Sequence, residues 1–324
     1  MAVAFKFAID SNVVAQAAGI RLYDLHTDVE AICRAHEAVA PLARRLGVAP
    51  PRPGLAGCAY VHASTIGCEV LITPDSAEPW AGPCISSPEQ IDDLREPDDY
   101  LSAGIVPGRL ALAAKLKRRC PDASEKIGHD LEGPVTTAAL MMGQSFFMLP
   151  YDNPARAHRL LEFVTRSAIN YIKIIRTHQH RPVSGSWQSM PDDFAGMFGP
   201  AQFAEFVVPY WNMLFEGLAA EQRGVHSELL RPEHMRFLAD VKLDVYDPGV
   251  NQYLIPKAVR RHCPVPYQLR LWPAQVRDHS AAELVEMYRH LASFEPVSIE
   301  FGLFDLAEEA KIAALLEVAR ELAQ

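Results

Sequence analysis

Residues 224–247, which read GVHSELLRPEHMRFLADVKLDVYD, carry the clearest structural pattern in the chain. Residues 224–227 and 241–246 are short apolar runs typical of buried strands, and residues 232–239 between them are typical of a helix. A strand, a helix and a second strand in this order predict two parallel strands joined by a right-handed crossover. The stretch therefore indicates an α/β fold.

The same alternation extends outward in both directions. The further strands that we expect are 69–73, 126–131, 186–190, 267–271 and 297–301. The helices that we expect are 12–19, 28–46, 107–119, 203–218 with a kink at Pro209, 281–291 and 305–322, together with one that starts at the Ser87-Pro88 pair and a long one that starts near Pro154. So many strand–helix units favour a closed (β/α)8 barrel of the TIM type. An open doubly wound sheet is the alternative, but no glycine-rich phosphate loop supports it. We expect one domain over residues 1–324, in which residues 1–57 form a mainly helical N-terminal extension.

Composition excludes several classes of protein. The chain has 324 residues, of which 49% are hydrophobic and 22% charged, as is ordinary for a globular enzyme. The net charge of -9 is spread along the chain, so there is no basic face for nucleic acid. No apolar run approaches the roughly 20 residues that span a bilayer. The first ten residues, MAVAFKFAID, lack the apolar core of a signal peptide.

The cysteine pattern points to the compartment. Six cysteines are scattered without a CxxC pair, which is typical of reduced thiols rather than of a disulfide framework. We therefore expect a cytoplasmic protein with no membrane partner. A homodimer remains compatible with the sequence, because barrel helices that pair with a second copy look like any other amphipathic helix.

Polar side chains follow several of the expected strands, at the mouth of the barrel where active sites lie. His226 and Glu228 are two residues apart, so on an extended strand their side chains point the same way. An imidazole and several carboxylates that converge from neighbouring strands form a plausible site for a divalent metal. The residues at these strand ends that could ligate a metal are His226, Glu228, Asp247 and Glu300. The catalytic candidates that follow the strand at 186–190 are Asp192 and Asp193.

A purely structural interpretation of these residues stays open. His226 is then a hydrogen-bonded barrel histidine, and the acids pair with arginines that stand nearby in the sequence: Arg231, Arg236 and Arg260. Trp272 follows the strand at 267–271, where an indole can wall a pocket for an organic substrate. We assign Trp187 to the substrate pocket as well.

Several motifs resemble the uroporphyrinogen decarboxylase superfamily. One begins at Gly133-Pro134 and continues through Thr136 to Gly143, and a second is Tyr151-Asp152-Asn-Pro154. The longest runs from Asp192-Asp193 to Pro209-Tyr210 and includes a proline within its helix. The resemblance spans nearly the whole chain and implies a (β/α)8 barrel.

The superfamily holds decarboxylases and corrinoid-linked methyltransferases. The decarboxylases carry an N-terminal Arg-Gln-Ala-Gly-Arg loop, whereas the nearest stretch here, from Gln16 to Arg21, lacks the first arginine. The segment from Gly19 to Glu30 instead resembles the methyltransferases, which bind zinc through a His-x-Cys pair and a later cysteine. By that resemblance, His226 matches the histidine, Glu228 stands in the place of the first cysteine, and Glu300 falls near the last cysteine. Cobalamin-independent methionine synthase has a similar zinc site with an added acidic ligand, and Asp247 falls near the place of that ligand.

A ligand set of one histidine and three carboxylates makes a harder Lewis acid than a thiolate set, and it suits an oxygen centre. The hypothesis is a zinc-dependent, or otherwise divalent-metal-dependent, methyltransferase. It moves a methyl group between a small, methoxylated substrate and a corrinoid carried by a partner protein. The alternatives are a decarboxylase-like lyase acting on a carboxylated tetrapyrrole, a non-catalytic small-molecule binder, and a metal-dependent hydrolase that uses Asp192 or Asp193 as its base.

Overall fold

The computed structural model describes residues 2–75, 78–128, 131–185 and 187–324 and has an α/β fold. The strands are β1 (Ala4–Ile9), β2 (Glu69–Leu71), β3 (Trp80–Gly82), β4 (Trp187–Pro191), β5 (Gln222–His226), β6 (Val245–Asp247), β7 (Gln268–Arg270) and β8 (Ser298–Leu303). Strands β4, β5 and β6 pair in parallel, and so do β7, β8 and β1. A parallel bridge between Tyr246 and Tyr267 joins the two sheets. The parallel order is therefore β4-β5-β6-β7-β8-β1.

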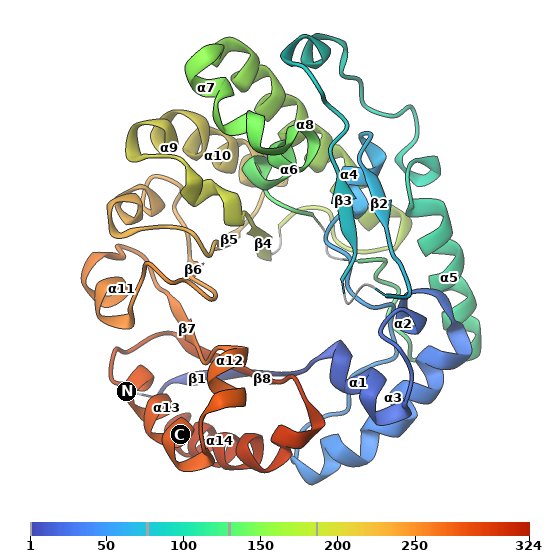
Figure 1. The fold of residues 1–324 in the computed structure, drawn as a ribbon, viewed down its shortest axis with the longest axis vertical. Helices are drawn as coiled ribbons and strands as arrows, with labels where there is room; N and C mark the ends of the chain where they lie inside the picture. The colour runs from blue at the N-terminus through green and yellow to red at the C-terminus, as the bar shows by residue number, and fades with distance from the viewer. Residues whose placement is uncertain (1, 76–77, 129–130, 186) are drawn as a thin grey trace.

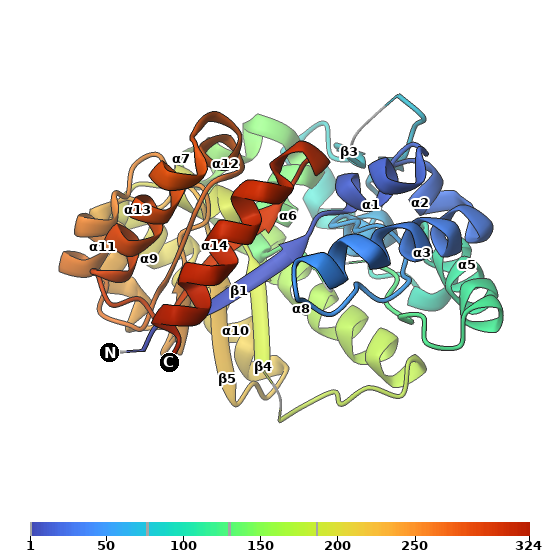
Figure 2. The same ribbon diagram turned by 90° about the horizontal axis from the view of Figure 1, so that it is seen from below.

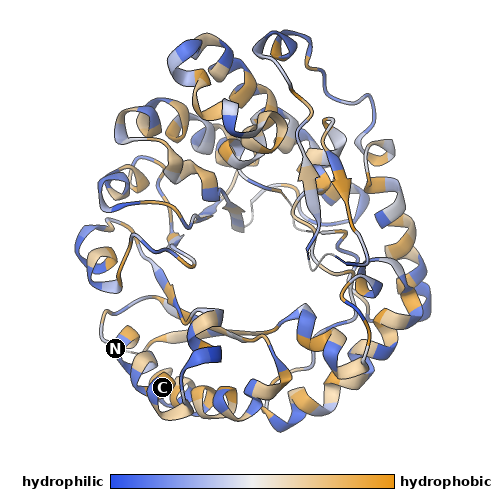
Figure 3. Ribbon diagram, in the orientation of Figure 1, coloured by the Kyte–Doolittle hydropathy of each residue, from blue (hydrophilic) through white to orange (hydrophobic). Residues whose placement is uncertain are grey.

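Helices surround these strands (Figure 1). The α-helices are α1 (Ser11–Ala18), α2 (Asp24–Thr27), α3 (Val29–Arg45), α4 (Val61–Thr65), α5 (Val106–Arg119), α6 (Pro134–Met142), α7 (Leu149–Asp152), α8 (Pro154–His178), α9 (Pro200–Phe206), α10 (Val208–Gly217), α11 (Pro256–His262), α12 (Pro273–Asp278), α13 (Ala281–Ala292) and α14 (Glu309–Leu322). Short 3-10 helices are η1 (Pro88–Asp93), η2 (Tyr100–Ser102), η3 (Gly143–Phe147), η4 (Asp193–Met197), η5 (Pro232–Leu238) and η6 (Leu306–Glu308). Apolar and polar residues are interleaved along the outer helices (Figure 3), as amphipathic helices require.

Local signals explain where helices begin and end. The Asn153 side chain accepts a hydrogen bond from the Arg156 N–H, and Pro154 takes the first helical position of α8. Ser280 and Glu283 form a capping box at the start of α13. The expected helix at 203–218 is interrupted at Val207, between α9 and α10, because Pro209 cannot donate the hydrogen bond that would continue it.

Strand β1 is the main difference from the expected organisation. The sequence predicts a mainly helical extension over residues 1–57, whereas β1 pairs along its whole length with β8. Phe5 and Phe7 on this strand pack against Phe301 of β8, with ring centroids 6.1 and 5.5 Å apart. The alternating apolar residues of β1 explain the strand, and its partner lies at the opposite end of the chain. Figure 2 shows α14 running beside β1, with the two termini close together.

The segment at 126–131 also differs from expectation. Residues 129 and 130 lie outside the described residues, and the described remainder of the segment is not a strand. The described backbone of the segment is bonded to side chains instead: the Lys126 N–H donates to Ser124 Oγ at 3.2 Å, and Arg109 of α5 donates to the carbonyl oxygen of Ile127.

Two cysteines depart from the expectation of reduced thiols. Cys33 on α3 and Cys120 after α5 form a disulfide, and Cys58, Cys68, Cys84 and Cys263 are free. The pair is separated by 87 residues in the sequence, so only the packing of α3 against α5 brings it together. Within the described ranges, no helix is long and apolar enough to cross a membrane.

Candidate metal centre

Parallel pairing aligns the carboxyl ends of three strands. Pro191 at the end of β4 pairs with His226 at the end of β5, which pairs in turn with Asp247 at the end of β6. Polar residues that follow these strands therefore gather at one edge of the sheet. Asp193 comes two residues after β4, and Glu228 two residues after β5.

His226 is at the centre of this group. Its Nδ1–H donates a hydrogen bond to Asp247 Oδ2 at 2.7 Å. Its Nε2 lies 3.6 Å from Asp193 Oδ1 and 3.5 Å from Glu228 Oε1. One ligand atom from each of Asp193, His226 and Glu228 lies within 4.8 Å of the other two. The Nε2 atom of His226 thus faces Asp193 and Glu228, while its Nδ1 atom is hydrogen-bonded to Asp247.

Backbone amides fix the carboxylates of this group. The Glu228 N–H donates to Asp193 Oδ1 at 3.0 Å, and the Val250 N–H donates to Glu228 Oε1 at 2.8 Å. Gly249 has a positive φ of 58°, and a Cβ there would lie 2.5 Å from both Glu228 Oε1 and His226 Cε1. Glycine is therefore required where this loop passes over the site.

Charged and polar side chains on β7, β8 and β1 form a connected series of contacts that ends at Asp247. Arg270 Nη2 donates to Asp247 Oδ2 at 2.6 Å and lies 3.4 Å from Glu300 Oε1. Gln268 Nε2 donates to Glu300 Oε2 at 3.3 Å, and Lys6 Nζ donates to Gln268 Oε1 at 2.7 Å. These contacts connect four strands, β6, β7, β8 and β1, through their side chains.

Burial and neighbouring charges shift the pKa values of the residues around His226. Burial alone would lower the pKa of His226, but hydrogen bonds to Asp247 and Glu228 and the negative charges of Asp247 and Asp193 raise that pKa to about 10. The pKa of Asp247 falls well below its usual range, since the hydrogen bond to His226 and the charge of Arg270 outweigh its burial. Burial raises the pKa of Asp193, and the hydrogen bond to His226 lowers that of Glu228.

Asp192 plays a different part from Asp193. Its side chain is 0% exposed and accepts hydrogen bonds from Trp211 Nε1 at 2.6 Å, the Thr136 N–H at 2.7 Å and the Val135 N–H at 3.3 Å. Burial raises the pKa of Asp192 to about 6, against the lowering effect of these donors. The carboxylate joins the end of β4 to the first turn of α6 and to α10.

The structure brings together some of the predicted site residues and separates others. His226, Glu228 and Asp193 form the compact group, with Asp247 bound to the far nitrogen of the imidazole. Glu300 contacts Arg270 and Gln268 instead of this group. Trp272 lines a cavity of about 220 Å³ that Gly249 and Arg270 also border. Trp187 is the first residue of β4, and its side chain lies outside the described part of the structure.

Three residues at the mouth were missed by the sequence analysis. Arg270 lies on β7, within the expected strand at 267–271, and no local pattern distinguishes it as a site residue. Glu132 comes immediately before the Gly133-Pro134 motif, and Tyr60 comes just before α4. Burial raises the pKa of Tyr60, and the charges of Glu132 and Asp193 raise it further. The position of Glu132 after an expected strand was the one available signal.

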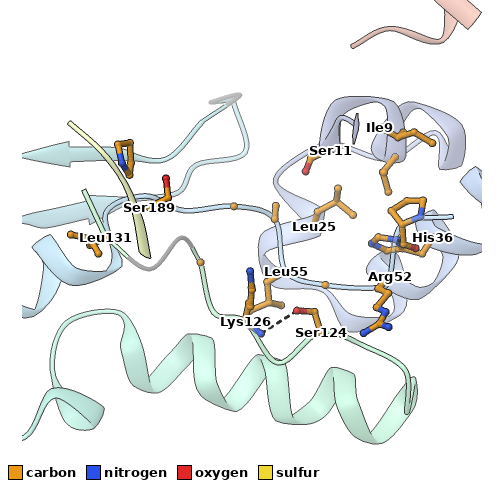
Figure 4. Close-up of a pocket in the computed structure, with 17 residues that line it drawn as sticks. Ile9, Ser11, Leu25, His36, Arg52, Leu55, Ser124, Lys126, Leu131 and Ser189 are labelled. Carbon is orange, nitrogen blue, oxygen red and sulfur yellow. Dashed lines mark hydrogen bonds between the residues drawn. The ribbon is translucent and has the colours of Figure 1, made fainter. Parts of the chain in front are cut away.

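A larger cavity lies next to the centre, between β1 and β4. Its volume is about 540 Å³, and residues from 51–57 and 124–131 line it together with Ser189 and Pro191 of β4. Figure 4 shows Lys126 and Ser189 at this cavity, with Ser11 on its opposite side. Since Pro191 is two residues from Asp193, the cavity gives a small molecule room beside the group of Asp193, His226 and Glu228.

The donor set fits a divalent cation. An imidazole nitrogen and carboxylate oxygens are ordinary ligands of zinc, manganese and iron. The second nitrogen of a metal-binding histidine usually donates to a carboxylate, as His226 does to Asp247. An α/β protein with such a group at the carboxyl ends of parallel strands has the usual layout of a barrel enzyme.

Comparisons with known proteins identify the family. Residues 12–247 match the family model described as uroporphyrinogen decarboxylase (URO-D), and the chain belongs to this family. The resemblance found in the sequence is thereby confirmed. A solved structure described as a methyltransferase from Methanosarcina mazei is similar over 100% of this chain and 95% of that chain, with a TM-score of 0.73 and 14% identity. At this identity the likeness concerns the fold. A search of curated protein sequences gives no match.

Proposed function

We propose that the chain is a (β/α)8-barrel methyltransferase that depends on a divalent metal. It moves a methyl group between a small methoxylated substrate and the corrinoid of a partner protein. The observation that carries the proposal is the compact group of His226, Asp193 and Glu228, whose histidine is oriented by Asp247. The family of the chain and the fold of its methyltransferase neighbour support the assignment.

Two hydrogen bonds support the barrel. The parallel order β4-β5-β6-β7-β8-β1 leaves room for two further strands between β1 and β4. The Ser124 N–H donates to Pro53 O, and the Gly133 N–H donates to Pro191 O. Ser124 is thus bonded to the loop that contains Pro53, and Gly133 is bonded to the end of β4, which supports a chain path that closes the gap between β1 and β4 as in a barrel of eight strands.

The ligand set supports chemistry at oxygen. His226, Asp193 and Glu228 would hold the ion, and an ion with these ligands supplies Lewis-acid chemistry toward an ether oxygen. Asp247 keeps the Nδ1 proton of His226 in place, so that Nε2 faces the other two ligands. The acidic surroundings of the site favour a cation and disfavour an anionic leaving group, which must therefore take up a proton as it leaves.

The overall reaction balances as follows. The methyl–oxygen bond of the substrate breaks, and the oxygen keeps the bonding pair and takes a proton. The methyl group bonds to the cobalt of a Co(I) corrinoid, which supplies the electron pair. The products are a hydroxyl compound and a methyl-Co(III) corrinoid. The cavity beside Pro191 is large enough for a monocyclic methoxylated compound.

The charges at the mouth argue against a decarboxylase acting on a tetrapyrrole with many carboxylates. Such a substrate needs several arginines that converge on it. Here Asp193, Glu228 and Asp247 lie together, and the guanidinium of Arg270 already contacts Asp247 and Glu300. A polycarboxylate would be repelled from this part of the mouth.

A methyl-transfer assay with free cob(I)alamin tests the proposal. The purified protein, loaded with Zn²⁺, is mixed with cob(I)alamin and a panel of methoxybenzenes, and the absorption spectrum is followed. We expect methylcobalamin and an equal amount of phenol with the wild type, and neither with His226→Ala. Glu216→Gln, an exposed change on α10, is the control and should behave as the wild type. Lack of conversion by the zinc-loaded wild type with every donor would contradict the proposal.

A further inference from the structure

Glu132 is held beside the metal ligands by the backbone around it. The neighbouring Gly133 N–H donates to the carbonyl oxygen of Pro191, the last residue of β4. The N–H groups of Val135 and Thr136 donate to the carboxylate of Asp192. A Cβ at Gly133 would lie 2.4 Å from Asp192 Cβ, so the two segments are as close as glycine allows. Glu132 therefore stands next to the loop that presents Asp193.

The carboxyl group of Glu132 lacks the partners that burial demands. Its Oε2 is buried and has no hydrogen-bond partner within the described residues. Buried carboxylates are normally hydrogen-bonded, paired with a cation or protonated, since an unpaired charge is costly away from water. Burial raises the pKa of Glu132 well above its usual range, and the charges of Asp193 and Asp192 raise it further.

The neighbours of Glu132 are the residues of the metal centre. Asp193 and Asp192 oppose a charge on Glu132, and His226 favours one. The charge of Glu132 also affects Tyr60. Glu132 thus lies within electrostatic reach of Asp193 and His226, and its buried Oε2 has no hydrogen-bond partner among the described residues.

We infer that Glu132 is a further cation-binding residue of this centre and that its free oxygen is a ligand for the ion held by His226, Asp193 and Glu228. The inference rests on the proposed metal site. A divalent ion supplies the positive charge that the buried carboxylate lacks, and the carboxylate adds a third hard oxygen donor to the set. The resulting site, with one imidazole and three carboxylates, selects divalent ions that accept oxygen ligands and substrates that bind through oxygen.

The test compares Glu132→Gln with the wild type in metal binding. The dissociation constant for Zn²⁺ is measured by titration of the metal-free proteins, with His226→Ala as the disabled site and Glu216→Gln as the control. Glutamine keeps the size of the side chain and removes the charge. We expect Glu132→Gln to bind Zn²⁺ at least about tenfold more weakly, which is the loss typical when one group of a metal site is removed.

Two further measurements separate ligation from misfolding and from distant electrostatics. The metal-free Glu132→Gln protein should melt at the same temperature as the wild type or higher, because an unpaired buried carboxylate has been removed. With Co²⁺ in place of Zn²⁺, its visible absorption bands should shift in position and intensity, since a ligand has been lost.

The outcomes distinguish this inference from the proposed function. Unchanged Zn²⁺ affinity in Glu132→Gln, with binding abolished in His226→Ala, would overturn the role of Glu132 and leave the metal site intact. Weaker binding with an unchanged Co²⁺ spectrum would also overturn ligation. A wild type that binds no metal would instead contradict the proposed function itself.

Discussion

Two aspartates that are neighbours in the sequence belong to different regions of the molecule. Asp192 is fully buried between β4, α6 and α10, where Trp211 and two backbone amides donate to it. Asp193 is partly exposed at the mouth, where it faces His226 and accepts the N–H of Glu228. The first aspartate stabilises the frame, and the second is available to a cation.

The backbone N–H and carbonyl groups of Asp192 are both bonded to residues at the end of β5, and this fixes the position of the next residue, Asp193. The Asp192 N–H donates to the carbonyl oxygen of His226, and Ser227 Oγ donates to the carbonyl oxygen of Asp192. The backbone of Asp192 is therefore fixed to β5, so the next residue projects toward the imidazole. The buried Asp192 fixes the backbone, and the partly exposed Asp193 faces His226 and accepts the Glu228 N–H.

The largest effect that we expect is on stability, from Asp192→Ala. The change leaves three buried N–H donors without an acceptor, and it should lower the free energy of unfolding by about 3 kcal/mol or more. Asp193→Ala should lower it by no more than about 1 kcal/mol, because its side chain is partly exposed. Urea denaturation of the metal-free proteins measures both. Equal losses of unfolding free energy in the two variants would contradict the claim that Asp192 contributes more to stability than Asp193.

A smaller effect, on metal affinity, is expected from Asp247→Asn. Asparagine keeps the shape of the side chain, but it weakens the hold on the Nδ1 proton of His226 and removes the charge opposite Arg270. Zn²⁺ affinity should fall by about tenfold to a hundredfold, as is typical when the carboxylate behind a ligating histidine is altered. Glu300→Gln is the matched comparison and should change the affinity by less than about threefold. A larger loss of Zn²⁺ affinity in Glu300→Gln would indicate that Glu300 is a direct ligand.

The most gradual effect is the dependence of metal binding on pH. In the metal-free protein the pKa of His226 is raised to about 10, so the imidazole carries a proton at neutral pH that an ion must displace. Apparent Zn²⁺ affinity should therefore rise with pH, by about tenfold for each unit between about pH 6.5 and 8.5. Calorimetric titrations in buffers of different ionisation enthalpy measure the released proton. A flat profile would mean that His226 is not a ligand.

The same shift has a consequence for folding. The pKa of His226 is higher in the folded protein than its ordinary value of 6.5, so the proton stabilises the native state. That stabilisation is complete below about pH 6.5 and is lost as the pH rises through 10. The melting temperature of the metal-free wild type should decline over this range more steeply than that of His226→Ala.

Much of the site could be predicted because it follows the strand pattern. His226 and Glu228 stand at the end of a strand with a clear apolar run, and Asp193 follows β4, whose position at 186–190 was predicted within a residue. Side chains at the ends of parallel strands share one edge of the sheet, so their meeting follows from topology. The roles of the individual acids could not be predicted, because they depend on which partner each one contacts. Arg270, for example, engages both Asp247 and Glu300.

The N-terminal half was harder to predict for physical reasons. Strand β1 is stabilised by a partner nearly the whole length of the chain away, and no local pattern records that contact. Glu132 lies after a segment whose described residues are held by loop contacts rather than by a strand ladder. Its importance comes from an oxygen without a hydrogen bond, and such an absence is visible only in three dimensions.

The central claim is that His226, Asp193 and Glu228 hold a divalent metal, and elemental analysis tests it most directly. The tag-free wild type is purified without chelators and compared with His226→Ala and Glu228→Gln. We expect about one divalent ion per chain in the wild type and almost none in either variant. A wild type that is free of metal, and that takes up none on incubation with Zn²⁺, Mn²⁺ or Fe²⁺, would contradict it.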